Sequence, residues 1–142
     1  MILKDIMTRN VASITPEDTV VKAAQLMKEY DVGSIPVCRE QKVVGIVTDR
    51  DIVLRSAAEG KSIQTQKISD IMTTNPVSGK PDMDVHDAAR IMSERQIRRL
   101  PVVDNNNLVG MVSLGDLAVE SILVDNAGEA LSNISEASTI PM

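Results

Sequence analysis

Two copies of a short motif, Gly-x-x-(Thr/Ser)-x-x-Asp, carry the residue types best suited to binding chemistry. The copies occupy residues 45–51, with Thr48 and Asp51, and residues 110–116, with Ser113 and Asp116. A hydroxyl at a helix start lies beside free N–H groups and the positive end of the macrodipole, which favour a phosphate. A carboxylate accepts hydrogen bonds from neighbouring hydroxyls, such as a ribose diol. The motif therefore predicts a site for phosphate at one end and ribose at the other.

The same spacing is also that of a helix capping box. In that motif a Thr or Ser side chain and an acidic residue three positions later bond reciprocally to each other's backbone N–H groups. Capping and ligand binding do not exclude each other, because both use the free groups at a helix start. Both interpretations of the motif therefore stay open.

The remaining reactive side chains do not form a site. His86 falls in the first turn of an expected helix with no second His or Cys nearby, and Cys38 has no partner base. We interpret them as a solvated histidine and a buried small side chain. No zinc spacing and no Ser-His-Asp or Walker pattern occurs, so we expect no metal, no catalytic residue and no enzyme activity.

The motif belongs to a longer internal repeat, which determines how the chain is organised. Ile6-Met7-Thr8 recurs as Ile71-Met72-Thr73, and the offset of 65 residues continues without a gap to Asp51 and Asp116. About 18 of the 48 positions from Asp5 to Ile52 are identical in the second copy. The chain therefore contains two homologous units.

Each unit predicts the same elements. Apolar residues spaced i, i+3, i+4, i+7 indicate an amphipathic helix over Thr19–Tyr30, with Thr19, or Asp84 in the second copy, as its N-cap. A short strand, Val11–Ile14, is expected before this helix. A β-hairpin of the strands Ser34–Cys38 and Lys42–Thr48 follows it, and then a second helix, Asp49–Ala58, capped by Gly60. The equivalent second helix of the second copy is Leu114–Leu123.

The predicted fold class is α+β, with two β-α-β-β-α repeats packed through their sheets with pseudo-twofold symmetry. A single unit would leave one sheet face apolar, so the repeats should not fold independently. The expected boundaries are 1–60 for the first repeat, 61–67 for a linker, 68–124 for the second repeat and 125–142 for a polar C-terminal tail. We expect the tail to be a frayed helix end followed by a mobile segment.

Composition excludes several classes of function. The net charge of −5 argues against a nucleic-acid binder, and Tyr30, the only aromatic residue, leaves no stack of rings for a base. No apolar run approaches the length of a membrane-spanning helix, and the single cysteine excludes an internal disulfide. We expect a cytoplasmic protein with no nucleic-acid or membrane partner.

The repeated features in their order resemble a tandem cystathionine-β-synthase (CBS) domain pair, or Bateman module. The resemblance covers about Lys4 to Leu123 and rests on the Ile-Met-Thr opening, the Val-x-x-Ala-Ala-x-x-Met helix, the Pro-Val strand and the Gly-x-x-(Thr/Ser)-x-x-Asp motif. It implies clefts between the repeats that hold adenosine compounds such as AMP, ADP, ATP or S-adenosylmethionine. Such a nucleotide would be a regulatory ligand, and no cofactor is required.

The resemblance also assigns roles to residues. Thr48 and Ser113 would contact phosphate or ribose, and Asp51 and Asp116 would hold the ribose hydroxyls. Adenine would lie against the first strand and the residues at the strand proline, which are Ile14, Thr15, Ile35 and Pro36 in one copy and Gly79, Lys80, Leu100 and Pro101 in the other.

Three arginines are further candidates for phosphate contacts. Arg98 and Arg99 resemble the basic pair before Leu-Pro in the AMP-sensing γ subunit of AMP-activated protein kinase, and Arg50 matches another basic phosphate contact of that family. The first copy has Gly33-Ser34 instead of the arginine pair, and the second has Gly115 instead of Arg50. The alternative for Arg98 and Arg99 is a solvated strand edge, and burial of either would favour binding.

We therefore expect a regulatory module that senses an adenosine nucleotide, with a protein-interaction or dimerisation scaffold without ligand as the alternative. The family also suggests a homodimer and an unidentified protein target. Apolar positions on the helices that face away from the sheets would serve the dimer: Ile52, Val53, Leu117 and Leu123.

Overall fold

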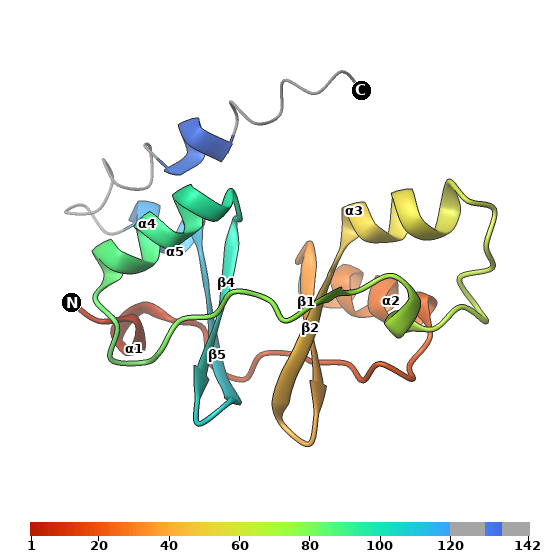
Figure 1. Ribbon diagram of the computed structural model, residues 1–142, viewed down its shortest axis with the longest axis horizontal. Helices are drawn as coiled ribbons and strands as arrows, with labels where there is room; N and C mark the ends of the chain where they lie inside the picture. The colour runs from red at the N-terminus through yellow and green to blue at the C-terminus, as the bar shows by residue number, and fades with distance from the viewer. Residues whose placement is uncertain (120–129, 135–142) are drawn as a thin grey trace. The chain divides into compact units, whose positions relative to one another are not determined.

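The computed structural model describes residues 1–119 and 130–134, and Figure 1 shows its elements. The chain divides into two compact units, each named here after the hydroxyl residue of its motif. The Thr48 unit comprises Ala12–Pro76 with Asn106–Leu108; the Ser113 unit comprises Met1–Val11, Val77–Asn105 and the described residues from Val109 onward. The mixture of helices and antiparallel strands confirms the predicted α+β class.

In the Thr48 unit a helix, a hairpin and a second helix follow one another as predicted. They are α2 (Val20–Tyr30), β1 (Ser34–Arg39), β2 (Lys42–Thr48) and α3 (Asp49–Ile52), which continues as a π-helical turn, η1 (Val53–Ala57). β1 and β2 are antiparallel, with Ser34 opposite Thr48. Gly60 has φ +71° three residues after η1, and the N–H of Lys61 donates to the carbonyl of Ser56 at 3.1 Å, as in the predicted glycine cap.

The Ser113 unit has the same succession of elements. They are α4 (Val85–Arg95), β4 (Arg99–Asp104), β5 (Asn107–Ser113) and α5 (Leu114–Val119). The helix predicted over Leu114–Leu123 is confirmed as far as Val119, and its remainder lies outside the described residues. Within the expected tail, residues 130–134 form a helical turn with Ala130 and Ile134 buried; the rest of the tail is not described.

The strand predicted at Val11–Ile14 is wrong in extent. Only Ile14 pairs, through a single parallel bridge to Val37, with its N–H donating to the carbonyl of Pro36 at 3.1 Å. The equivalent bridge in the Ser113 unit joins Gly79 to Val102.

The apolar stripe predicted on each first helix faces the core of its own unit. Val20, Ala23 and Met27 of α2 are buried, and so are Val85, Ala88, Ala89 and Met92 of α4. Leu117, expected to face outward, is instead fully buried in the core of the Ser113 unit, so that expectation is wrong. Val53 is 57% exposed, as expected.

The opening segment of each repeat packs in the unit formed by the other repeat. In the Ser113 unit α1 (Leu3–Ile6) donates from the Leu3 N–H to the Met83 carbonyl at 2.9 Å, and Thr8 pairs with Met111. In the Thr48 unit η2 (Ile68–Asp70) and β3 (Thr73–Thr74) take the same place, since the Ile68 N–H donates to the Asp18 carbonyl and β3 pairs with β2. We call Leu3–Thr8 and residues 68–74 the exchanged segments, because each packs in the unit formed by the other repeat. The sequence does not predict this exchange.

The motif glycines allow the exchanged segments to approach the hairpins closely. A Cβ on Gly45 would lie 2.8 Å from the carbonyl oxygen of Thr73 and 2.9 Å from the sulfur of Met72. A Cβ on Gly110 would lie 3.0 Å from the carbonyl oxygen of Thr8 and overlap the side chain of Met7. The glycine of each motif is therefore explained by the Met-Thr segment that crosses it, without reference to a ligand.

We predict that Gly45→Ala lowers the free energy of unfolding by about 1–3 kcal/mol, because the new methyl group must displace the backbone of β3. Urea unfolding measures this change. Gly115→Ala is the matched control, since its Cβ would meet only Ser113 Oγ at 3.5 Å and alanine favours a helix. Equal stability of Gly45→Ala and the wild type would contradict the prediction.

Candidate functional site

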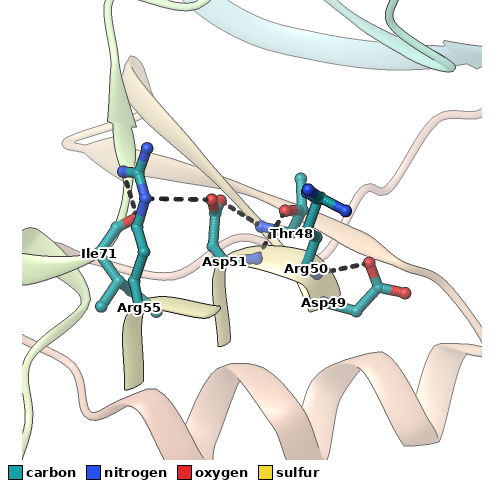
Figure 2. A network of polar contacts seen from close by, with 6 residues as sticks. All are labelled: Thr48, Asp49, Arg50, Asp51, Arg55 and Ile71. Carbon is teal, nitrogen blue, oxygen red and sulfur yellow. Dashed lines mark hydrogen bonds and ion pairs between the residues drawn. The ribbon is translucent and has the colours of Figure 1, made fainter. Parts of the chain in front are cut away.

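The motif of the Thr48 unit forms a complete capping box where β2 passes into α3. The Thr48 N–H donates to Asp51 Oδ2 at 2.9 Å, and the Asp51 N–H donates to Thr48 Oγ1 at 3.1 Å (Figure 2). Both residues are partly buried. This confirms the capping interpretation for the first copy of the motif.

The second copy forms the same box at the start of α5. The Ser113 N–H donates to Asp116 Oδ2 at 2.8 Å, and the Asp116 N–H donates to Ser113 Oγ at 3.1 Å. Each aspartate thus uses one carboxylate oxygen for the box. Because a carboxylate has about four acceptor positions, both retain the capacity to accept from a ligand hydroxyl.

One end of each hairpin is tied to the adjoining helix start by a hydrogen bond at the same repeat position. The Asp49 N–H donates to the Gly33 carbonyl at 2.9 Å in the Thr48 unit, and the Leu114 N–H donates to the Arg98 carbonyl at 3.0 Å in the Ser113 unit. The two bonds bring the start of β1 or β4 beside its capping box. Arg98 and Arg99 therefore lie at the same end of the Ser113 unit as Ser113 and Asp116.

The arginine pair is accessible from that end of the unit. Arg98 is exposed and Arg99 is half-buried. Within residues 1–119 and 130–134 neither guanidinium is in an ion pair. Neither arginine is fully buried, so the burial that would favour binding is not observed, and both positions fit a solvated edge as well as a phosphate contact.

In the Thr48 unit the basic candidates lie on the helix itself. Arg50 is exposed in the first turn of α3, where its N–H donates to Asp49 Oδ1 at 2.8 Å. Sequence reasoning missed Arg55, whose Nε lies 3.8 Å from Asp51 Oδ1. The i, i+4 spacing of an aspartate and an arginine on one helix was the signal that would have found it.

The residues expected beside adenine are brought together within each unit. The N–H of Ile14 bonds to the carbonyl of Pro36, and the N–H of Gly79 bonds to the carbonyl of Pro101 at 2.8 Å. The remaining side chains divide into two groups: Thr15 and Lys80 are exposed, while Ile14, Ile35 and Leu100 are at most 2% exposed and belong to the cores. What these segments offer to a ligand is therefore mainly backbone and the exposed Thr15 and Lys80.

Thr15 is held in place by a turn that sequence reasoning also missed. Its N–H donates to Asp18 Oδ2 at 2.8 Å, and Lys22 Nζ lies 3.4 Å from the same oxygen. Partial burial raises the pKa of Asp18, but the hydrogen bonds from Thr15 and the charge of Lys22 outweigh it, so the pKa is lowered overall. Asp18 is thus the residue that fixes the segment entering α2.

The described residues contain no group of three or more His, Cys, Asp or Glu side chains that is arranged to hold a metal ion. His86 is exposed and its Nδ1 lies 2.9 Å from Asp84 Oδ1; hydrogen bonds from His86 lower the pKa of Asp84. Burial raises the pKa of the Cys38 thiol, which disfavours the nucleophilic thiolate. None of the described helices is long and apolar enough to cross a bilayer.

Comparison with known proteins identifies the family. The family model of the CBS domain matches residues 3–58 and 68–122. The chain belongs to the CBS-domain family. The CBS domain-containing protein YhcV of Bacillus subtilis is 51% identical to it over 133 residues, which are 94% of each chain.

Solved structures of similar proteins share the fold. A crystal structure of Hypoxic Response Protein I with two coordinated zinc ions has a TM-score of 0.79 and 30% identity, and the match covers 84% of this chain and 98% of that one. The crystal structure of CBSX2 in complex with AMP has a TM-score of 0.75 and 28% identity, covering 87% and 98%.

The pKa of Asp18 leads to a prediction about acid. A lowered pKa in the folded state means that the carboxylate stabilises the fold above the usual aspartate pKa, and that this contribution is lost as the pH falls through the folded value. We expect Asp18→Asn to lower the free energy of unfolding by at most about 1 kcal/mol at pH 6 and by progressively less below pH 4, because the Lys22 side chain is 52% exposed and solvent screens its ion pair with Asp18.

Urea unfolding of the wild type and Asp18→Asn between pH 6 and pH 3 measures this difference. Asp82→Asn removes an exposed carboxylate from a loop and should show no such convergence. A wild-type advantage over Asp18→Asn that stays constant down to pH 3 would disprove the role of Asp18.

Proposed function

We propose that the chain is a regulatory module that senses an adenosine-containing nucleotide: AMP, ADP, ATP or S-adenosylmethionine. The observation that carries the proposal is the pair of complete Thr/Ser-Asp boxes, each with a carboxylate that keeps acceptor capacity beside basic side chains. Membership of the CBS-domain family and the AMP complex of CBSX2 support the choice of nucleotide.

The proposed contacts follow from the chemistry of each residue. The ribose hydroxyls donate to Asp51 in the Thr48 unit and to Asp116 in the Ser113 unit, with Thr48 and Ser113 beside them. Phosphate is held by Arg50 in the one and by Arg98 and Arg99 in the other, because charge-assisted bonds to phosphate are the strong ones. Adenine lies against the backbone of the segments at Thr15 and Lys80.

The two sites are unequal, which bears on how many ligands bind. The Ser113 unit has two arginines at the start of its strand, whereas the Thr48 unit has Gly33 and Ser34 there and its arginines on the helix. We therefore expect different affinities at the two sites, and calorimetry with one tight and one weaker phase.

A specific observation favours the alternative of a scaffold without ligand. The boxes are complete in the structure, so capping alone is a sufficient reason for Thr48, Asp51, Ser113 and Asp116. In that case no nucleotide would change the thermal stability. In either case we propose a regulatory role without catalysis, in the cytoplasm. We also propose that the chain forms a homodimer through exposed apolar side chains such as Val53 and Leu54.

We predict that the best nucleotide of a panel of AMP, ADP, ATP and S-adenosylmethionine raises the melting temperature. A ligand at 100 times its Kd stabilises by about 2.7 kcal/mol, which corresponds to a rise of roughly 5–10 °C for a chain of this size. Differential scanning fluorimetry measures the shift and calorimetry the stoichiometry. No shift and no heat with any member of the panel would reject the proposal in favour of the scaffold.

The matched variants are Asp51→Asn and Asp116→Asn rather than alanine. Asparagine keeps an oxygen for the N–H of Thr48 or Ser113, so the box and the unliganded melting temperature should be nearly preserved. Each variant should lose most of the shift that arises at its own site. Asp31→Asn, at an exposed position, should retain the whole shift.

A further inference from the structure

Arg55 connects the capping box of the Thr48 unit to the exchanged segment. Its Nε lies 3.8 Å from Asp51 Oδ1, and its Nη1 donates to the carbonyl of Ile71 at 3.2 Å (Figure 2). Asp51 and Ile71 are 20 residues apart in the sequence and meet through this one side chain. All three residues belong to the Thr48 unit.

The two ends of the connection differ in how firmly they are held. The Ile71 side chain is fully buried, and the Met72 N–H, which shares a peptide plane with the Ile71 carbonyl, donates to the carbonyl of Ile68 at 2.9 Å. The carbonyl that Arg55 contacts is therefore fixed. The Asp51 side chain is 13% exposed, whereas that of Arg55 is 54% exposed and lies in the π-helical turn η1. Arg55 is therefore the most exposed member of the three.

The separation of Nε and Oδ1 suits a hydroxyl group between them. At 3.8 Å the pair is longer than a direct hydrogen bond of about 2.7–3.2 Å. An oxygen about 2.8 Å from both atoms would accept from Nε–H and donate to Oδ1. A hydroxyl is both a donor and an acceptor, so it satisfies both side chains at once.

We infer that Arg55 and Asp51 form a donor–acceptor pair for one ribose hydroxyl, and that Arg55 transmits its occupancy to residues 68–74. The inference rests on the proposed function and adds to it a binding residue and the segment that responds. A ligand hydroxyl holds Arg55 in place and so strengthens its bond to the Ile71 carbonyl. By linkage, whatever holds residues 68–74 in place also tightens binding of the ligand.

The inference applies to one unit only. At the repeat offset of 65 residues, Glu120 stands where the first copy has Arg55. A glutamate cannot donate in its charged form, so the second copy lacks this donor. The connection from a ligand hydroxyl through an arginine to the exchanged segment is therefore a property of the Thr48 unit.

Hydrogen exchange of the full chain tests the inference, with AMP and 2′,3′-dideoxy-AMP as probes, each at a concentration that saturates binding. AMP should slow exchange in a peptide covering residues 68–76 by at least about threefold, since a restrained carbonyl stabilises the turn around it. The dideoxy compound, which lacks both ribose hydroxyls, should leave that peptide unchanged.

Substitutions separate the side chain's geometry from its charge. Arg55→Lys keeps the charge but lacks the planar guanidinium, whose separate N–H groups contact the Ile71 carbonyl and the ligand hydroxyl at the same time. In this variant AMP should no longer slow hydrogen exchange of residues 68–76. Arg55→Gln should weaken AMP binding at this site about tenfold. Arg90→Gln, an exposed arginine on α4 paired with Asp87, is the matched control and should behave as the wild type.

Two kinds of failure are distinguishable. If AMP binds to the wild type by calorimetry but exchange in residues 68–76 does not change, or changes equally with the dideoxy compound or in Arg55→Lys, the role of Arg55 is overturned and the proposed function stands. If no nucleotide binds to the wild type, both are overturned.

Discussion

The close antiparallel pairing of each hairpin with a segment from the other repeat is the constraint on which the rest of the structure depends. Leu3 and Ile68 come from these segments and are fully buried in the Ser113 unit and the Thr48 unit respectively. Without them each core would contain a cavity the size of a large side chain, which costs several kcal/mol in a domain of marginal stability. This close pairing needs Gly45 and Gly110, because a Cβ at either position would meet the neighbouring Met-Thr segment. The same glycines begin the two motifs that carry the proposed chemistry.

Much of the local structure follows from the sequence because it depends on short-range patterns. The apolar stripe at Val20, Ala23 and Met27 predicts a helix and its buried face. The helix end near Gly60 is predicted because glycine tolerates the positive φ of a C-terminal cap. The capping boxes could also be predicted, since they need only residues three positions apart. The CBS family could be inferred because each of these patterns occurs twice at one offset.

The exchange could not be predicted because it is a long-range property. Ile-Met-Thr appears at the start of both copies, so the repeat alone cannot say which copy each segment joins. The arrangement of the candidate site can be predicted from the sequence only in part. The hydrogen bond from the Leu114 N–H to the Arg98 carbonyl brings the arginines to the capping box of the Ser113 unit. That bond joins residues that are close only because the hairpin folds, so local patterns do not predict it. The burial of Leu117 could not be predicted, because its helix is short and the sequence does not say which face is buried.

The exchange also determines the order in which the fold can be completed. The segment Leu3–Thr8 finds its hydrogen-bond partners at Met83 and Met111, about 80 to 100 residues further along the chain. During synthesis it must wait, with Leu3 exposed, until the second repeat has emerged, whereas residues 68–74 join a hairpin already made. The Thr48 unit can therefore close its core as soon as residues 68–74 have been made, and the Ser113 unit closes its core only after β5 has been made.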